Sequence, residues 1–418
     1  MSEVLNYLLV ALAILGLLSV VLEEVIHVNK AQSVLFFGAL SWVLLFIFST
    51  GHEAEHQSVL TGLQENIGEI AGLWLFLLSA MTFVVYLNQK GMIEGLIYKI
   101  LPEQVSERKL LFMTGIFAFV FSSLADNITA TLISIALILS LNLDTRKTLR
   151  FATLVVFAVN SGGVAMITGD VTTLMIFLEG KVSITNLMLL SLPSLLAVLL
   201  LATLLSLPLK ETAVIRRKHH EPAKVDFAIA LIFVSTILTT ILMNVFFSIP
   251  PVLTFLFGLS IMFLVARAFR EDTEHSPIMD YIRHIEFDTL MFFLGILLLV
   301  GALKEIHALD TFVSLYEHMP AWGANYLMGL LSSLIDNVPL TAALLKADVS
   351  MNLAEWLALT YAVGVGGSLL IIGSAAGIVA MSKVEALTFG TYLKFLFALA
   401  LSYSVGYIAV LGLGALVS

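Results

Sequence analysis

Long apolar blocks separated by short polar connections dominate the chain. Most blocks contain about 17–25 residues, the length that an α-helix needs to cross roughly 30 Å of hydrocarbon. The pattern predicts an all-α membrane protein, and we expect its first block to be a retained membrane helix, because neither the basic start nor the cleavage site of a signal peptide flanks it. The blocks fall at 5–22, 31–50, 67–87, 109–141, 150–178, 184–208, 226–247, 252–267, 287–303, 321–346, 354–381 and 389–416.

Two blocks, at 109–141 and 321–346, carry a polar cluster in the middle of an apolar run. The clusters are Ser-Ser-Leu-Ala-Asp-Asn, which starts at Ser122, and Ser-Ser-Leu-Ile-Asp-Asn, which starts at Ser332. Two full crossings need about 40 residues, more than either block has. Each block therefore fits a re-entrant hairpin, which enters the membrane and returns to the same side.

Lysine and arginine predict which connections share a side of the membrane. Four connections hold four, three, five and three of these residues, in the order 88–109, 142–150, 209–224 and 267–288. The other connections hold almost none outside helix ends. We expect the basic connections in the cytoplasm. Both flanks of 109–141 are basic, which agrees with a hairpin that enters from the cytoplasm, and the same reasoning makes 321–346 a hairpin that enters from outside.

Glycines interrupt two further blocks, at 150–178 and 354–381. The glycine pairs lie at 162–163 and 366–367. Unwound backbone at membrane depth survives only where it lines a cavity or packs in protein. We therefore expect two broken helices, with backbone carbonyl groups near the glycines left free to face a site.

The special features occur in the same order in both halves of the chain, which predicts an internal duplication. Because five full spans separate the equivalent helices, the second unit is upside down, as in many secondary transporters. Three pairs of segments match: FSSLADNITATL at 121–132 with LSSLIDNVPLTA at 331–342, GGVAMITGD at 162–170 with GGSLLIIGS at 366–374, and FLLSAMTFVV at 76–85 with FFLGILLLVG at 292–301.

The predicted architecture is about ten full transmembrane helices plus two re-entrant hairpins, in inverted-topology repeats with two broken helices. Four regions follow from it. They are N-terminal scaffold helices at 1–66, a first repeat at 67–208, connecting helices at 209–286 and a second repeat at 287–418.

Three aspartates, Asp126, Asp170 and Asp336, lie deep in these apolar segments. A carboxylate at the bilayer centre costs at least about 2.5–3.5 kcal/mol. No lysine or arginine lies in the same core segments to neutralise them. We therefore expect them to face a water-filled cavity or a bound cation, and to bind Na⁺, rather than only to cap the broken helices.

Carbonyl, hydroxyl and carboxylate oxygens form a hard donor set that suits a small hard cation. Hydroxyl groups are available beside the aspartates in both halves, and Ser374 stands where the first half has Asp170. The candidate ion-binding residues are Asp126, Asn127, Thr129, Asn160, Gly162, Gly163, Thr168, Asp170, Thr172, Thr173, Ser332, Ser333, Asp336, Asn337, Ser368 and Ser374.

Composition and motifs exclude several classes. Of the 418 residues, 59% are hydrophobic and 12% charged, against about 25% charged in a soluble protein, and cysteine is absent. No nucleotide-binding motif appears, so we expect neither a cofactor nor ATP-driven pumping, and no nucleic acid partner. His52-Glu53-Ala54-Glu55-His56 has the H-E-x-x-H spacing of a zinc protease, but we expect a solvated outer loop there. Weak metal binding or pH sensing remains an alternative for its histidines.

The chain resembles the NhaD-type sodium/proton antiporters, within the wider ion-transporter superfamily that also holds arsenite and dicarboxylate carriers. The resemblance covers the region from about residue 67 onward. It rests on FLLSAMTFV at 76–84, SSLADNITATL at 122–132, NSGGVAMITGDVTTLM at 160–175 and SSLIDNVPLTAALL at 332–345.

The resemblance implies a homodimer in the bacterial cytoplasmic membrane, in which the hairpin tips and broken helices form the ion site and move against a scaffold. It implies exchange of Na⁺ or Li⁺ for H⁺, not enzyme activity. Carboxylate carriers have Ser-Asn-Thr at the hairpin tips, which this chain lacks. An oxyanion or dicarboxylate carrier coupled to Na⁺ or H⁺ stays an alternative, and an intramembrane enzyme or a channel is disfavoured.

Overall fold

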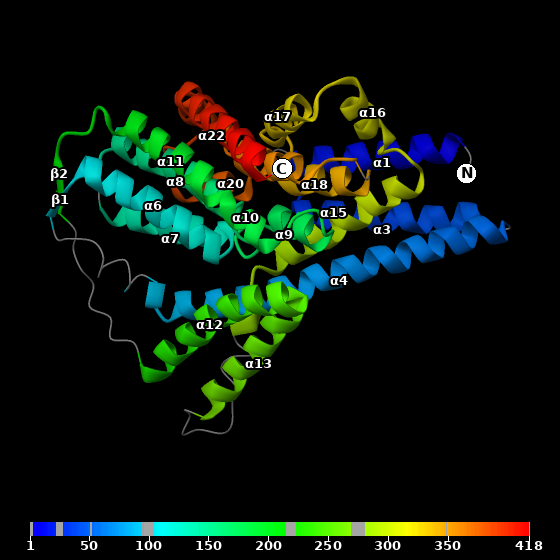
Figure 1. Cartoon of the computed structure of the whole chain (residues 1–418), viewed down its shortest axis with the longest axis horizontal. Coiled ribbons are helices and arrows are strands. Elements are labelled where there is room, and N and C mark those ends of the chain that lie inside the picture. Colours follow the sequence, from blue (N-terminus) through cyan, green and yellow to red (C-terminus); the bar gives the residue numbers. More distant parts are fainter. Residues whose placement is uncertain are drawn as a thin grey trace.

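The computed structural model is built almost entirely from helices, which run mostly along its long axis (Figure 1). It describes residues 3–21, 28–50, 52–93, 95, 104–141, 143–214, 223–268, 281–347 and 349–417. The predicted all-α fold class is confirmed.

Eight long stretches of helix within the described residues are long and apolar enough to cross a membrane. Two broken helices and two hairpins accompany these stretches in the described part of the chain. The eight stretches are α1 (Glu3–Val21), α3 (Lys30–Ser49), α4 (Glu53–Gln89), α10 with α11 (Ile184–Leu189 and Ser191–Ser206), α12 (Lys224–Phe247), α13 (Pro251–Ala268), α15 (Phe287–Glu305) and α22 (Leu396–Val417).

The first hairpin consists of α6 (Glu107–Leu124) and α7 (Asn127–Ser140), and α8 (Thr145–Gly163) follows it directly. Lys147, in the first turn of α8, lies 2.7 Å from a carboxylate oxygen of Glu107 at the start of α6. The two ends of the hairpin are therefore side by side, and the segment returns to the side from which it entered.

The second hairpin consists of α17 (Ala321–Ser332) and α18 (Asn337–Lys346), and α16 (Asp310–His318) precedes it. Lys346, at its end, lines one cavity with Ser58 near the start of α4 and His307 after α15. Figure 1 shows the first hairpin at the end of the molecule that carries β1 and β2, and the second toward the end where the N-terminus lies. The hairpins enter from opposite sides, as inverted repeats require.

Both broken helices are present, as α8 with α9 (Val171–Leu178) and α19 (Leu353–Gly366) with α20 (Ala375–Lys383), which α21 (Phe389–Leu393) follows. Gly162 and Gly366 lie inside helices rather than in the breaks. A Cβ on Gly162 would lie 2.1 Å from the carbonyl oxygen of Phe119 in α6, and one on Gly366 would lie 2.2 Å from that of Gly329 in α17. These glycines therefore allow each hairpin to cross its broken helix closely.

Equivalent hydrogen bonds in the two halves show the duplication directly. In the first hairpin, Ser122 Oγ donates to the Val159 carbonyl oxygen at 2.8 Å. In the second, Ser332 Oγ donates to the Val363 carbonyl oxygen at 2.6 Å. Each serine thus ties a hairpin tip to the broken helix of its own half.

The described parts of the four basic connections lie toward one end of the molecule. Strand β1 (Gln104–Ser106) pairs antiparallel with β2 (Thr212–Val214), and Lys147 also lies 2.7 Å from Glu211. The Tyr86 hydroxyl at the end of α4 donates to Asp226 of α12 at 2.6 Å, and the Tyr86 ring contacts that of Tyr281 before α15.

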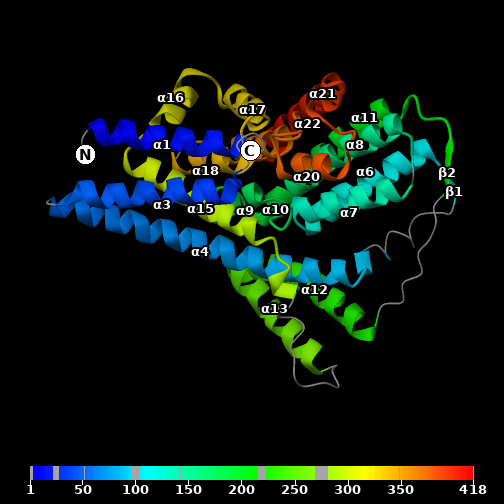
Figure 2. The same cartoon turned by 180° about the vertical axis from the view of Figure 1, so that it is seen from behind.

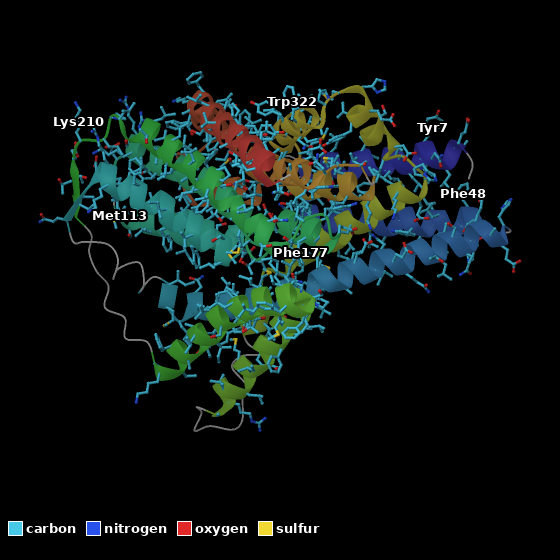
Figure 3. The ribbon with its side chains drawn as sticks, in the orientation of Figure 1. Tyr7, Phe48, Met113, Phe177, Lys210 and Trp322 are labelled. Carbon is cyan, nitrogen blue, oxygen red and sulfur yellow. The ribbon has the colours of Figure 1, made fainter. Side chains whose placement is uncertain are left out.

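Lys210 marks this end in Figure 3, and Phe48 lies at the opposite end. The grouping agrees with the expected topology. Arg216 and Lys218, which we also expect on the basic side, lie outside the described residues.

The H-E-x-x-H segment was predicted as a loop, and this prediction was wrong. His52 directly precedes α4, at its N-cap position, and Glu53 to His56 form the first turn of the helix. A helix of 37 residues is about 55 Å long, so α4 continues well beyond the hydrocarbon. The His56 ring packs on Phe46, its Nδ1 lies 3.1 Å from Ser49 Oγ, and no cluster of metal-binding side chains occurs in the described part of the chain.

Helices α3, α4 and α15 pack as one unit, seen from behind in Figure 2. A Cβ on Gly38 of α3 would lie 2.5 Å from the carbonyl oxygen of Gly295 in α15, so these two helices cross at close range. Trp42 Nε1 donates to the Leu298 carbonyl oxygen at 2.9 Å, and Trp74 Nε1 of α4 to that of Leu290 at 2.8 Å. We call this unit the scaffold.

Candidate functional site

A cavity of about 290 Å³ lies where the two hairpin tips and the two helix breaks meet. The three aspartates predicted from the sequence all line it. Hairpins and broken helices contribute Asp126, Asn127, Asn160, Asp170, Asp336, Asn337 and Ser374 to its wall.

Asp126 caps the start of α7 at the first hairpin tip. The backbone N–H of Thr129 donates to its Oδ1 at 2.8 Å, and the Thr129 hydroxyl donates to its Oδ2 at 2.7 Å. Capping by aspartate is ordinary helix chemistry. Here it also holds a carboxylate at the tip with its orientation fixed by two donors.

Asp170 connects the two halves of the molecule. It caps α9 after the first break, where the Thr172 backbone N–H donates to its Oδ1 at 3.2 Å. Asn337, from the opposite hairpin tip, donates through Nδ2 to its Oδ2 at 3.0 Å. The Asp170 side chain is buried, so this carboxylate stands at the interface between the repeats.

The second half supplies Asp336 and Ser374 at equivalent positions. Asp336 caps α18 through the backbone N–H of Val338 at 3.1 Å, and Ser374 accepts a hydrogen bond from Asn160 Nδ2 at 3.0 Å. Asn160 is fully buried, and its Oδ1 makes no hydrogen bond to the described residues. A buried amide oxygen without a donor is a suitable ligand for a cation.

The remaining predicted residues support the wall from behind. Thr168 Oγ1 donates to the Ser123 carbonyl oxygen at 2.7 Å, and Thr173 Oγ1 donates to that of Gly163 at 3.3 Å. The carbonyl group of Gly163, which we expected to be free, therefore accepts a hydrogen bond inside the protein. The residues outside the cavity lining are Thr129, Gly162, Gly163, Thr168, Thr172, Thr173, Ser332, Ser333 and Ser368.

Five polar residues of the scaffold side were missed by sequence reasoning. They line the cavity at the starts of α3 and α15, and they are Asn29, Lys30, Glu286, Asp288 and Thr289. Asn29 Nδ2 donates to Asp288 Oδ2 at 2.8 Å. These residues lie at or near helix ends, where polar and charged side chains ordinarily face water. Nothing in the sequence therefore distinguished them.

One basic side chain, Lys30, lines the cavity with the aspartates although none lies in the core of their own segments. It lies at the start of a different apolar block, and the fold carries it into the cavity. The part of the cavity wall at the start of α15, which we call the mouth, carries the acidic side chains Glu286 and Asp288. Partial desolvation, and next the negative charge of Asp126, raise the pKa of the Glu286 carboxyl above its ordinary value.

Comparison with known proteins decides the family. A family model described as citrate transporter (CitMHS) matches residues 1–366. The Na⁺/H⁺ antiporter NhaD of Vibrio parahaemolyticus is 31% identical over 408 residues, which cover 90% of this chain and 98% of the relative. The chain belongs to the NhaD antiporter family.

Other NhaD-type relatives agree. The NhaD of Vibrio cholerae is 32% identical over 428 residues, covering 92% of this chain and 87% of that protein. Sodium/proton antiporter 1 of Arabidopsis thaliana is 29% identical over 414 residues, covering 90% and 68%. The two Vibrio NhaD relatives cover 90% and 92% of this chain, so the NhaD resemblance extends beyond the region from residue 67 onward in which the motifs lie.

Proposed function

We propose that this NhaD-family protein exchanges Na⁺ or Li⁺ for H⁺ across the bacterial cytoplasmic membrane and contributes to pH homeostasis. The observation that carries the proposal is the single cavity shared by Asp126, Asp170 and Asp336. Three carboxylates in one pocket within the membrane need a compensating cation or protons. An exchanger uses both in turn.

The chemistry of exchange follows from competition. The ionised carboxylates attract Na⁺, with the Asn160 amide oxygen as a further ligand. Protonation removes the negative charge and with it the affinity for Na⁺. Because the same oxygens bind either ion, Na⁺ and H⁺ occupy the site alternately. Each ion therefore crosses the membrane in the direction opposite to the other. If more protons than Na⁺ move in each cycle, the exchange is electrogenic, and we propose this stoichiometry.

Alternating access requires the cavity to face each side in turn. We propose an elevator-type movement in which the hairpins and broken helices shift as one body against the scaffold, within a homodimer. Hydrogen bonds inside each body support this division. The exposed Glu286 and Asp288, which line the cavity, belong to the basic connection 267–288 that we propose faces the cytoplasm.

A carrier of citrate or another carboxylate is the second candidate, because the matching family model carries that description. A tricarboxylate entering the cavity would meet the charges of Asp126, Asp170 and Asp336, with Lys30 as the basic side chain among the described lining residues. Repulsion between like charges at this depth disfavours that substrate.

Purified protein in proteoliposomes separates the two functions. We expect Na⁺ and Li⁺ added outside vesicles with an acidic interior to cause proton efflux, detected by a pH-sensitive dye, and we expect citrate to cause none. Proton movement driven by citrate, with none driven by Na⁺ or Li⁺, would replace antiport by carboxylate transport.

A further inference from the structure

Lys30 occupies an unfavourable place for a residue that serves only its own helix. It is the first residue of α3, where the helix dipole is positive and a basic side chain is disfavoured. The cap is made by its neighbour, since Asn29 Oδ1 accepts the backbone N–H of Ala31 at 2.8 Å. Helix stability therefore does not account for a lysine here.

The surroundings of Lys30 explain better why a lysine stands at this position. Its ammonium nitrogen lies 5.0 Å from the centre of the Phe292 ring, and both residues line the central cavity. Asp336 of the second hairpin tip and Glu286 at the start of α15 line the same cavity wall as Lys30. The titratable groups that face the same cavity are Asp126, Asp170, Asp336, Glu286 and Asp288.

The charges belong to different bodies. Lys30 lies on the scaffold, whereas the three aspartates lie on the hairpins and the first broken helix. A positive charge fixed on one body attracts negative charge on the other most strongly when no cation separates them. Its effect on the site thus depends on whether Na⁺ or protons already neutralise the aspartates.

We propose that Lys30 is an internal countercharge that competes with the transported cation for the aspartate cluster. This inference rests on the proposed function and deepens it. With the site ionised and free of Na⁺, the Lys30 ammonium stabilises the carboxylates. Na⁺ binding must displace that interaction, so Lys30 lowers the affinity of the site for Na⁺. In the conformation that brings the aspartates close to Lys30, this competition promotes release of Na⁺.

The test is Na⁺ binding to the purified full-length protein, measured by calorimetry at one alkaline pH. We expect Lys30→Gln to bind Na⁺ about tenfold more tightly than the wild type, since the substitution removes from the cavity wall a positive charge that repels the bound cation. Lys30→Arg retains the charge and should bind as the wild type does. Lys90→Gln is the matched control, because Lys90 also lies over an aromatic ring, that of Tyr86, but outside the cavity.

Unchanged or weaker Na⁺ binding by Lys30→Gln would overturn the inference, and so would a Lys30→Arg variant that behaves like Lys30→Gln. Wild-type protein that exchanges Na⁺ while Lys30→Gln shows no tighter binding would leave the proposed function standing. Wild-type protein that binds no Na⁺ would refute the proposed function and, with it, the role of Lys30.

Discussion

Asp170→Asn is expected to reduce Na⁺/H⁺ exchange to the level of empty vesicles while the protein still folds. The amide has nearly the shape of the carboxyl group but cannot titrate and carries no charge. Asp170 is also the carboxylate to which Asn337 of the opposite hairpin donates, and its equivalent in the second half is Ser374. The second half therefore has no carboxylate at that position to replace it.

The measurement is dye-detected exchange in proteoliposomes, with the amount of folded protein checked by size-exclusion chromatography in detergent. Asp310→Asn is the matched control, because Asp310 is an exposed aspartate outside the cavity. Asp126→Asn and Asp336→Asn should also lose most activity. Wild-type exchange by all three site variants would refute the carboxylate mechanism.

Linking residues 69 and 346 covalently is expected to stop exchange. Glu69 of α4 and Lys346 of α18 form an ion pair that joins the scaffold to the second hairpin. Beside it lies a cavity of about 340 Å³ that Glu179, the residue after α9, also lines. If the hairpin must slide along α4, a tether at this pair holds the protein in one state. Binding of Na⁺ should persist, because the central cavity is elsewhere.

The chain has no native cysteine, so Glu69→Cys with Lys346→Cys can be bridged by a short bismaleimide. We expect the double variant to exchange ions before the reagent and to lose exchange after it. The same reagent on Tyr86→Cys with Asp226→Cys joins α4 to α12, both outside the proposed moving body, and should leave exchange intact. Full exchange by a completely bridged 69–346 pair would show that this movement is not required.

The sequence predicted the elements whose physical signal is local. Polar clusters in apolar runs located both hairpin tips, and the basic connections predicted that 109–141 turns back, which the contact between Lys147 and Glu107 confirms. The repeated Ser-Ser-Leu-x-Asp-Asn motif also placed Asp126 and Asp336 in one cavity.

Contacts between distant segments could not be predicted in this way. Lys30 and Glu286 lie at ends of helices far apart in sequence, and only the fold brings them to the aspartates. Glu69 pairs with Lys346, 277 residues away, and no local pattern indicates this contact. The His52–His56 segment was mistaken for a loop because its polar composition hides the continuation of α4.

The predicted boundaries of the four regions are not tested by these contacts and stay predictions. The boundary at residue 66 falls within the continuous helix α4. Composition changes at that point because the helix leaves the membrane, which is a change of solvent rather than a change of structure.

The central claim is that Na⁺ and H⁺ compete for the same carboxylates, and the pH dependence of Na⁺ binding to the purified protein tests it most directly. A carboxylate must be ionised to bind Na⁺, so lowering the proton concentration frees sites. Affinity should rise with pH, about tenfold per pH unit for each proton displaced, until the site is fully deprotonated. Na⁺ affinity that stays constant across the pH range in which exchange operates would contradict the account.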